Sequence, residues 1–264
     1  MFKIKITLLI LMLPVFVNAQ NWEVGFQLGG ANYIGDLAPE IVFSETKMAS
    51  GLFIKKNVNP FISHTFAFVQ GQISGNDNNF KHLEIRNLSF FTTITEFSYL
   101  FEFNFFPFGL GIHPNKFTPY AFIGGAGFLY EPRTQYNQNI IKLAGLDTEG
   151  VHLESNKSAY SLYQFAIPLG GGIKFKVNKS INLTISYGFR YTFTDYLDDV
   201  STTYYNIDIL QNAYGPIASE LSDRSSTSIG YDGKQRGRPD LIDWYMFTGV
   251  GLSFQIRNKV CFEF

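Results

Sequence analysis

The sequence has 264 residues, a length that fits one all-β domain. Aromatic residues make up 17% of it and charged residues only 16%, against a usual charged share of about 25%, which suits a protein with much of its surface in lipid. The net charge of −1 and the pI near 6.4 give no basic footprint, so nucleic-acid binding is excluded.

The first 19 residues have the three parts of a secretory signal peptide. Lys3 and Lys5 form a basic start, residues 8–16 an apolar middle, and Val17-Asn18-Ala19 a small-residue cleavage site. We therefore expect residues 1–19 to be a removed signal peptide and residues 20–264 to form one domain. No Cys follows the cleavage site directly, so no lipoprotein is predicted, and no later run of about 20 apolar residues predicts a transmembrane helix.

Alternation of large apolar and small polar residues recurs along the rest of the chain. It is clearest in residues 181–194, where Ile, Leu, Tyr and Phe occupy the odd positions and Asn, Thr, Ser, Gly and Arg the even ones. A period of two predicts a β-strand, and this run exceeds the roughly 9 to 11 tilted residues that cross a bilayer. The eight predicted strands are residues 22–34, 48–56, 61–74, 89–106, 117–130, 160–177, 181–194 and 242–256.

The bulk of the two faces predicts which one meets lipid. Large apolar side chains on every strand would overfill a small barrel, whereas Ser, Thr, Gly and an occasional charge fit inside one. We therefore expect the aromatic face to point outward. The alternative is a soluble sandwich or lipocalin-like barrel, in which the apolar face is buried and the polar face is wet.

The lengths of the connections alternate as well. The links after the second, fourth and sixth strands are short, whereas residues 35–47, 75–88, 131–159 and 196–241 form long segments. Outer-membrane barrels have short periplasmic turns and long extracellular loops. The sequence therefore predicts an all-β fold, an eight-stranded antiparallel transmembrane β-barrel of OmpA-like size, with both termini in the periplasm.

The C-terminus repeats the outward parity through Val260, Phe262 and Phe264. An aromatic last strand that ends on Phe resembles the signal by which bacterial outer-membrane barrels are recognised for insertion; edge packing is the alternative. The only cysteine, Cys261, cannot form an internal disulfide, and we interpret it as a packing or lipid-facing residue.

Neither the histidines nor the glycine runs form a recognisable site. His64 and its neighbour Ser63 point to opposite faces of one strand, and His82, His113 and His152 fall in loops without triad or metal spacing. We therefore predict no catalytic residue, no cofactor and no metal. The alternative is a lipid- or peptide-modifying barrel enzyme that uses His64 with a hydroxyl on a neighbouring strand.

Charged residues on inward-facing positions predict a filled lumen. These residues are Glu96, Glu102, Lys174, Lys176 and Arg190. Because a buried charge is costly unless it is paired, we expect them to form ion pairs that plug the barrel. Catalytic carboxylates or an ion path through a small pore are the alternatives.

Three aspartates, Asp195, Asp198 and Asp199, cluster where the seventh predicted strand enters its long loop. Carboxylates so close together repel unless they are paired, bound to a cation or solvated. We predict that this acidic corner is structural and fixes the base of the loop. Its expected partners are Arg190, Arg224, Arg236 and Arg238.

Three stretches carry a family resemblance. They are Glu23-Val24-Gly25 with Gly29-Gly30 and Tyr33-Ile34-Gly35-Asp36-Leu37, then the run from Arg190 to Ser201, and finally Arg236-Gly237 followed by Asp243-Trp244-Tyr245. Together they resemble the PorG-like outer-membrane β-barrels of Bacteroidota, also described as a domain of unknown function.

The resemblance implies a role in the type IX secretion machinery at the cell outer membrane. In that machinery the barrel associates with outer-membrane lipid and with a periplasmic ring of a lipoprotein and its ring partner, and it supports protein export and gliding. The resemblance implies no enzymatic activity and no cofactor. The candidate structural or partner-contacting residues are Tyr33, Gly35, Asp36, Arg190, Asp195, Tyr196, Asp198, Asp199 and Trp244.

Overall fold

The computed structural model describes residues 22–109, 115–153 and 160–256. The expectations for the signal peptide, for His113, for Cys261 and for the C-terminal residues 260–264 lie outside the described residues.

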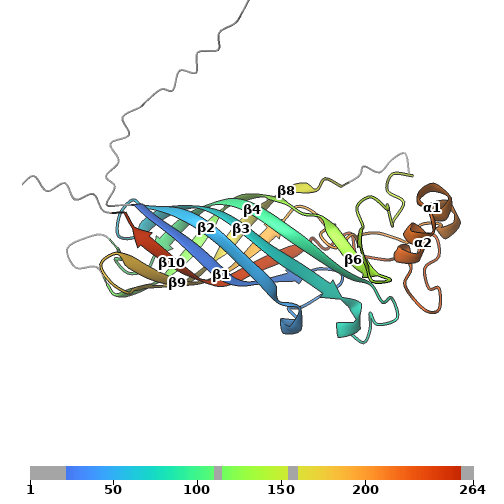
Figure 1. Ribbon diagram of the computed structural model, residues 1–264, viewed down its shortest axis with the longest axis horizontal. Coiled ribbons are helices and arrows are strands. Elements are labelled where there is room, and N and C mark those ends of the chain that lie inside the picture. The colour runs from blue at the N-terminus through green and yellow to red at the C-terminus, as the bar shows by residue number, and fades with distance from the viewer. Residues whose placement is uncertain (1–21, 110–114, 154–159, 257–264) are drawn as a thin grey trace, which may run out of the picture.

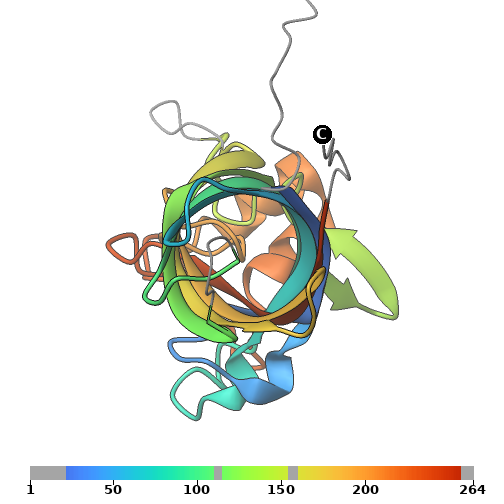
Figure 2. The same cartoon turned by 90° about the vertical axis from the view of Figure 1, so that its left-hand side faces the viewer.

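Eight long antiparallel strands close into a barrel (Figures 1 and 2). In chain order they are β1 (Trp22–Ile34), β2 (Lys47–Asn57), β3 (Ile62–Asn76), β4 (Ser89–Asn104), β5 (Phe117–Leu129), β8 (Tyr163–Lys176), β9 (Ile181–Thr192) and β10 (Trp244–Gln255). Neighbours pair in the order β3-β2-β1-β10-β9-β8-β5-β4, and a β3–β4 pairing closes the ring. The predicted strand boundaries differ from these by at most three residues, at the start of β8.

The outer face of the barrel is apolar, as the bulk argument predicted. Exposed large apolar side chains occur on every barrel strand, among them Leu28 (53%), Leu52 (66%), Phe97 (59%) and Phe165 (59%). A soluble barrel would bury this face, because contact between apolar surface and water is unfavourable. The fold is therefore the predicted eight-stranded transmembrane barrel, and the soluble alternative is wrong.

The two ends of the barrel differ. Short turns join β2 to β3 and β8 to β9 at one end, where β1 also begins and β10 ends; we call this the short-turn end. The long segments gather at the other, the long-loop end. They contain secondary structure that the sequence did not predict, including a hairpin of β6 (Pro132–Tyr136) and β7 (Asn139–Lys142) and the helices α1 (Ile207–Tyr214) and α2 (Pro216–Ser222).

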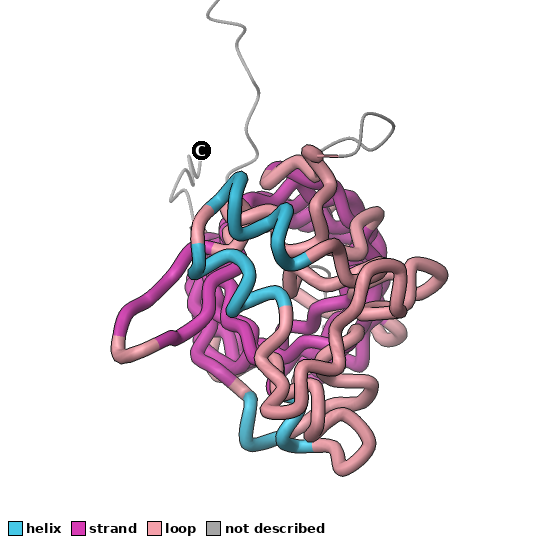
Figure 3. Tube along the Cα trace, turned by 90° about the vertical axis from the view of Figure 1, so that its right-hand side faces the viewer, coloured by secondary structure: helices cyan, strands magenta, loops and turns pink. Residues whose placement is uncertain are grey.

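These added elements lie in the segments that extend from the ends of the barrel strands. The hairpin continues the wall, because β6 pairs with β4 at Phe91 and Thr92. Figure 3 shows α1 and α2 across the long-loop end, and short 3-10 turns, η2 (Phe43–Glu45) and η3 (Asp77–Asn79), lie in the first two long segments. Among the described residues no helix has the length and apolarity needed to cross a membrane.

Candidate functional site

A buried cluster around Glu102 of β4 lies in the lumen near the short-turn end. Lys174 of β8 places its Nζ 2.6 Å from Glu102 Oε2, and Lys55 of β2 places its Nζ 3.0 Å from the same atom. Thr65 donates a hydrogen bond of 2.5 Å to Glu102 Oε1. Glu102 and Lys174 thus belong to the predicted lumenal network of ion pairs, and Lys55 is a member that the sequence analysis missed.

Glu23 extends this cluster to the first and last strands. Its two carboxylate oxygens accept hydrogen bonds from Asn57 Nδ2 (2.7 Å) and Ser253 Oγ (2.5 Å). Because β1 and β10 are the two terminal strands of the barrel, these bonds hold the closure from inside. Lys176 is half-buried at the short-turn end, and the ion pairs of the described residues do not include it, contrary to expectation.

A second lumenal cluster lies closer to the long-loop end. Arg190 of β9 donates from Nε to Glu96 Oε2 (3.0 Å) and from Nη2 to Glu96 Oε1 (3.2 Å). Tyr245 of β10 donates to Glu96 Oε2 at 2.8 Å, and the guanidinium lies 4.6 Å from the centre of the Phe247 ring. This forked pair satisfies both buried charges, as the lumen prediction required.

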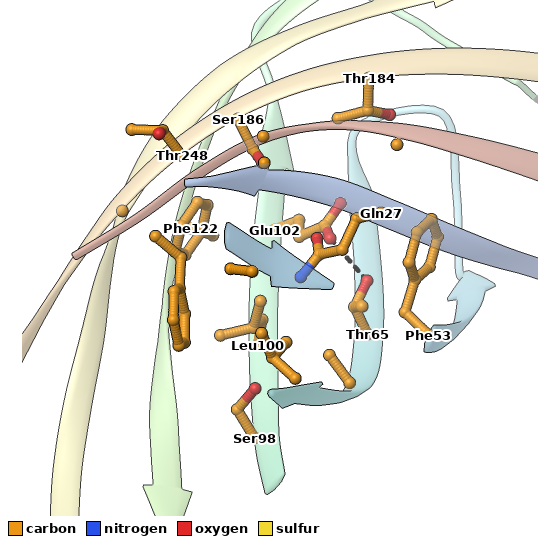
Figure 4. Close-up of a pocket in the computed structure, with 18 of the residues that line it drawn as sticks. Gln27, Phe53, Thr65, Ser98, Leu100, Glu102, Phe122, Thr184, Ser186 and Thr248 are labelled. Carbon is orange, nitrogen blue, oxygen red and sulfur yellow. Dashed lines mark hydrogen bonds between the residues drawn. The ribbon is translucent and has the colours of Figure 1, made fainter. Parts of the chain in front are cut away.

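A cavity of about 60 Å³ lies among these side chains. Figure 4 shows Gln27, Thr65 and Glu102 among the residues that line it. A volume of this size holds a few water molecules and no larger solute. The lumen is thus filled by side chains.

The long-loop end is closed by a third cluster, the acidic plug, centred on Tyr33, Asp198 and Asp243. The Tyr33 hydroxyl lies 2.5 Å from Asp198 Oδ2 and 2.9 Å from Asp243 Oδ1, and all three residues are buried. A phenol has one hydrogen, so it can donate to only one of the two carboxyl groups. The other contact requires a protonated carboxyl group that donates to the phenol oxygen.

The surroundings of Asp198 and Asp243 favour the protonated form of a carboxyl group. Burial raises the pKa of Asp243, and repulsion from Asp198 raises it further; burial and repulsion from Asp36 likewise raise the pKa of Asp198. Asp243 Oδ2 accepts the backbone N–H of Leu197 at 2.8 Å, which fixes the start of the last long loop against β10. The plug therefore joins β1, the loop after β9 and the start of β10 through one hydrogen-bonded unit.

Gly35 has no room for a side chain. A Cβ there would lie 2.0 Å from Asp243 Oδ1 and 2.1 Å from the Tyr33 hydroxyl. The backbone of Gly35 pairs with Ala38 in an isolated bridge, which brings the chain across the plug. A glycine at this position is thus a packing requirement of the plug.

Asp36 and Arg86 link the first two long segments to the last. Arg86 Nη2 donates to the Asp36 carbonyl (2.9 Å) and to Asp77 Oδ1 (2.6 Å), and its Nη1 donates to the Arg236 carbonyl (2.6 Å). Asp36 Oδ2 in turn accepts the backbone N–H of Arg238 at 2.9 Å. Arg86 was not a predicted site residue, and its cation lies among three different loops.

Asp199 ties the third long segment to the fourth. Thr148 donates to Asp199 Oδ2 at 2.7 Å, and the Tyr160 hydroxyl donates to Asp199 Oδ1. Burial raises the pKa of Asp199 to about 6, although the positive charge of Arg236 opposes the shift. Arg236 itself bonds the Asp199 carbonyl (2.8 Å) and Glu149 Oε1 (3.0 Å).

Asp195 and Tyr196 complete the acidic corner. Both carboxyl oxygens of Asp195 are buried and lack a hydrogen-bond partner among the described residues. Burial raises the pKa of Asp195 to about 8, and the nearby Ser201 side chain offsets this only in part. The ring of Tyr196 stacks on Tyr160, with 4.6 Å between the centroids and 10° between the planes.

Among the described residues, the four arginines considered as partners form no ion pair with the carboxylates of the corner, and Arg236 alone of them bonds its backbone. Arg190 points into the lumen and pairs with Glu96, Arg224 donates to Ser89 and Thr134, and Arg238 lies 3.8 Å from Asp36. Arg236 reaches only the backbone of Asp199. Hydroxyl and backbone N–H groups satisfy Asp198 and Asp199 instead, because these carboxyl groups lie inside the plug.

Trp244 and His64 lie on the outer face. Trp244 meets Tyr191 edge to face, with 4.9 Å between the ring centroids, as in an aromatic girdle. His64 Nδ1 lies 2.6 Å from the Tyr99 hydroxyl, and the two rings are stacked. The barrel-enzyme alternative needed a catalytic hydroxyl beside His64, whereas its partner is a tyrosine on the lipid-facing wall. In the described part of the chain, no group of three His, Cys, Asp or Glu could hold a metal.

A family model described as Domain of unknown function (DUF6089) matches residues 2–220. The chain belongs to this family. The DUF6089 match runs from before β1 into α2, so it includes Tyr33, Asp36 and the acidic corner, while Asp243 and Trp244 lie beyond it. A comparison with curated proteins gives no match.

Several solved outer-membrane barrels are similar in fold. Neisserial surface protein A is 8% identical, with 89% of this chain and 96% of that chain covered and a TM-score of 0.44. The attachment invasion locus protein Ail of Yersinia pestis is 7% identical over 89% and 98%, with a TM-score of 0.42. OprG from Pseudomonas aeruginosa is 10% identical over 89% and 97%, with a TM-score of 0.40. At these values the likeness carries no information on function.

Proposed function

We propose that this protein is a non-enzymatic outer-membrane β-barrel that anchors a periplasmic ring of the type IX secretion machinery. Its partners would be a ring lipoprotein and a ring protein, and its role would be to support protein export and gliding. In this arrangement the short-turn end faces the periplasm and the long-loop end faces the outside, as the two loop lengths favour.

One observation carries the proposal. The three stretches that resemble the PorG-like barrels meet in the acidic plug, where Tyr33 contacts Asp198 and Asp243 across 165 and 210 residues of sequence. The stretch from Tyr33 to Asp36 alone is weak evidence, whereas the run from Asp195 to Val200 is fairly specific. Their contact in one buried unit supports treating them as a single family signature, and so supports the secretion role that the resemblance implies.

The filled lumen supports an anchor in preference to a pore. Lys55, Lys174 and Arg190 are each paired with a carboxylate inside the barrel, so the described part of the chain provides no row of free charges in the lumen along which ions could move. The outer-face position of His64 likewise favours a non-enzymatic role.

Co-purification tests the proposal. The tagged full-length protein is isolated from detergent-solubilised outer membranes of its own host, under conditions in which the ring stays intact. We expect the ring lipoprotein and the ring protein to be recovered with it, and not with a tagged, unrelated eight-stranded barrel from the same membranes. Recovery of the barrel alone, with an intact ring left in the other fractions, would count against the proposal.

A further inference from the structure

The outer wall at the long-loop end carries a groove that no part of the secretion role uses. It has a volume of about 590 Å³ and lies between η2 and the β6–β7 hairpin, which projects sideways from the wall (Figure 2). The outward residues Gln72 of β3 and Phe91 of β4 contribute to its floor, and Gln135 and Gln138 of the hairpin contribute to its far side.

The groove lies just above the lipid-facing band. On β3 and β4 the continuous run of outward apolar residues ends at Phe68 and Phe97. The next outward pair, Gln70 and Thr95, is joined by a hydrogen bond of 3.3 Å, and Phe91 lies farther toward the long-loop end. Gln72 follows Phe68 by four residues, which is roughly 13 Å along a strand and roughly 10 Å along the axis of a barrel with tilted strands. The floor therefore begins at the level of the lipid headgroups.

Exposed apolar side chains beside the groove point to contact with lipid. Phe43 of η2 is 89% exposed and Met48 of β2 is 80% exposed, and they flank the groove residues Glu45 and Lys47 in the chain. Large apolar side chains so open to solvent mark an interaction or membrane surface. The near edge of the groove thus continues the apolar band of the barrel wall.

The lining suits a neutral ligand rich in hydroxyl groups. Among the described residues, no side-chain hydrogen bond is recorded for Gln72, Gln135 or Gln138, and an amide offers both donors and an acceptor, as a sugar hydroxyl requires. Lys47 lies 3.7 Å from Glu45, so the charges of the groove cancel and do not select an anion. The volume is within the range of roughly 300 to 1,000 Å³ that is typical of small-ligand sites.

We propose that this groove binds the saccharide head of an outer-leaflet glycolipid. The amides of Gln72, Gln135 and Gln138 hydrogen-bond the sugar hydroxyls, and Phe91 supplies an apolar face for a sugar ring. The acyl chains remain in the leaflet beside Phe43 and Met48. Continuity of the groove with the lipid-facing wall favours a lipid-linked sugar over a free one. The inference does not depend on the secretion role.

The test compares variants that lose the amides but keep side-chain length. The full-length protein is placed in phosphatidylethanolamine nanodiscs with added purified lipopolysaccharide, and the bound glycolipid is measured by native mass spectrometry. We expect the double variant Gln72→Met, Gln135→Met to bind at least about tenfold more weakly, because it loses two hydrogen-bonding groups. Gln211→Met is the matched control, since Gln211 is exposed on α1 and does not line the groove.

Heat-modifiable migration on gels establishes that each variant is folded. If the double variant fails this check, Gln138→Met at the exposed hairpin turn replaces it, with an expected loss of about threefold for one amide. Equal binding by the groove variants and the wild type, or an equal loss in Gln211→Met, would overturn the site. Deacylated oligosaccharide from the same lipopolysaccharide is titrated in parallel. If it binds as tightly as the intact glycolipid, the groove takes free sugars and the lipid-linked assignment is wrong.

Discussion

At the scale of single residues, the acidic plug depends on the absence of a side chain at Gly35. We expect Gly35→Ala to lower the free energy of unfolding by roughly 1 to 3 kcal/mol, because its Cβ would collide with Asp243 and Tyr33, 2.0 and 2.1 Å away. Urea unfolding in detergent micelles measures the change. Gly145→Ala is the control, since a Cβ at Gly145 meets nothing within 4 Å. Equal stability of the two variants would contradict the packing role of Gly35.

Titration of the corner carboxyls gives the plug a pH dependence with a definite sign. The pKa values of Asp195 and Asp199 are raised to about 8 and about 6, above an unfolded value of about 3.9. Between the unfolded and folded values the folded plug binds more protons, so its stability is highest at low pH and falls as pH rises through about 6 to 8.

Limited proteolysis of the loops reports this loss directly. We expect cleavage within residues 196–241 to be faster at pH 9 than at pH 5, with the barrel strands intact. Asp195→Asn removes one titrating group and should flatten the dependence, whereas Asp232→Asn, a change at an exposed loop residue, should leave it unchanged. A cleavage rate that rises toward low pH would contradict the assigned direction.

At the scale of elements, ion pairs hold strands together across the lumen. Glu96 of β4 and Arg190 of β9 are both buried, and their bidentate contact joins strands that are not neighbours in the sheet. We expect Glu96→Ala to lower the free energy of unfolding by roughly 3 to 5 kcal/mol, because it leaves Arg190 buried and uncompensated.

A second substitution separates this charge effect from loss of packing. Glu96→Gln combined with Arg190→Met removes both charges and keeps most of the volume, so it should recover much of the lost stability. Urea unfolding of the single and double variants measures the difference. If the double variant is no more stable than Glu96→Ala, the lumen is held by packing and the ion pair is incidental.

The barrel strands could be predicted from the sequence, whereas the short elements of the long segments could not. Strands and faces follow from local alternation, so the predicted strand boundaries lie within three residues of the observed ones, and the predicted inward positions of Glu96, Glu102, Lys174 and Arg190 agree with the structure. The β6–β7 hairpin and the helices α1 and α2 are too short for their residue patterns to be distinguished from those of a polar loop. Hydrogen bonds such as Tyr33 to Asp243 join residues 210 positions apart, and no local pattern encodes them.

At the scale of the whole molecule, the barrel is closed at two levels. The lumenal clusters leave a cavity of about 60 Å³, and around the acidic plug the hydrogen bonds of Arg86 and Asp199 join the four long segments to one another. A barrel closed in this way suits the proposed role of a membrane anchor, and the charges inside it hold its strands together.

Electrical recording tests this closure. We expect the purified protein to give no conductance steps in planar lipid bilayers, because Lys55, Lys174 and Arg190 are paired with carboxylates in the lumen and its cavity holds only a few water molecules. Replacing Glu23, Lys55, Glu102 and Lys174 together by Ala removes the two buried lysines and the two buried glutamates of the Glu102 cluster, so no lone charge is left. If this quadruple variant also stays silent, the Arg190–Glu96 cluster and the plug suffice to block the lumen. Stable conductance of the wild-type protein would show that the side chains move apart in the membrane and that the barrel is a pore.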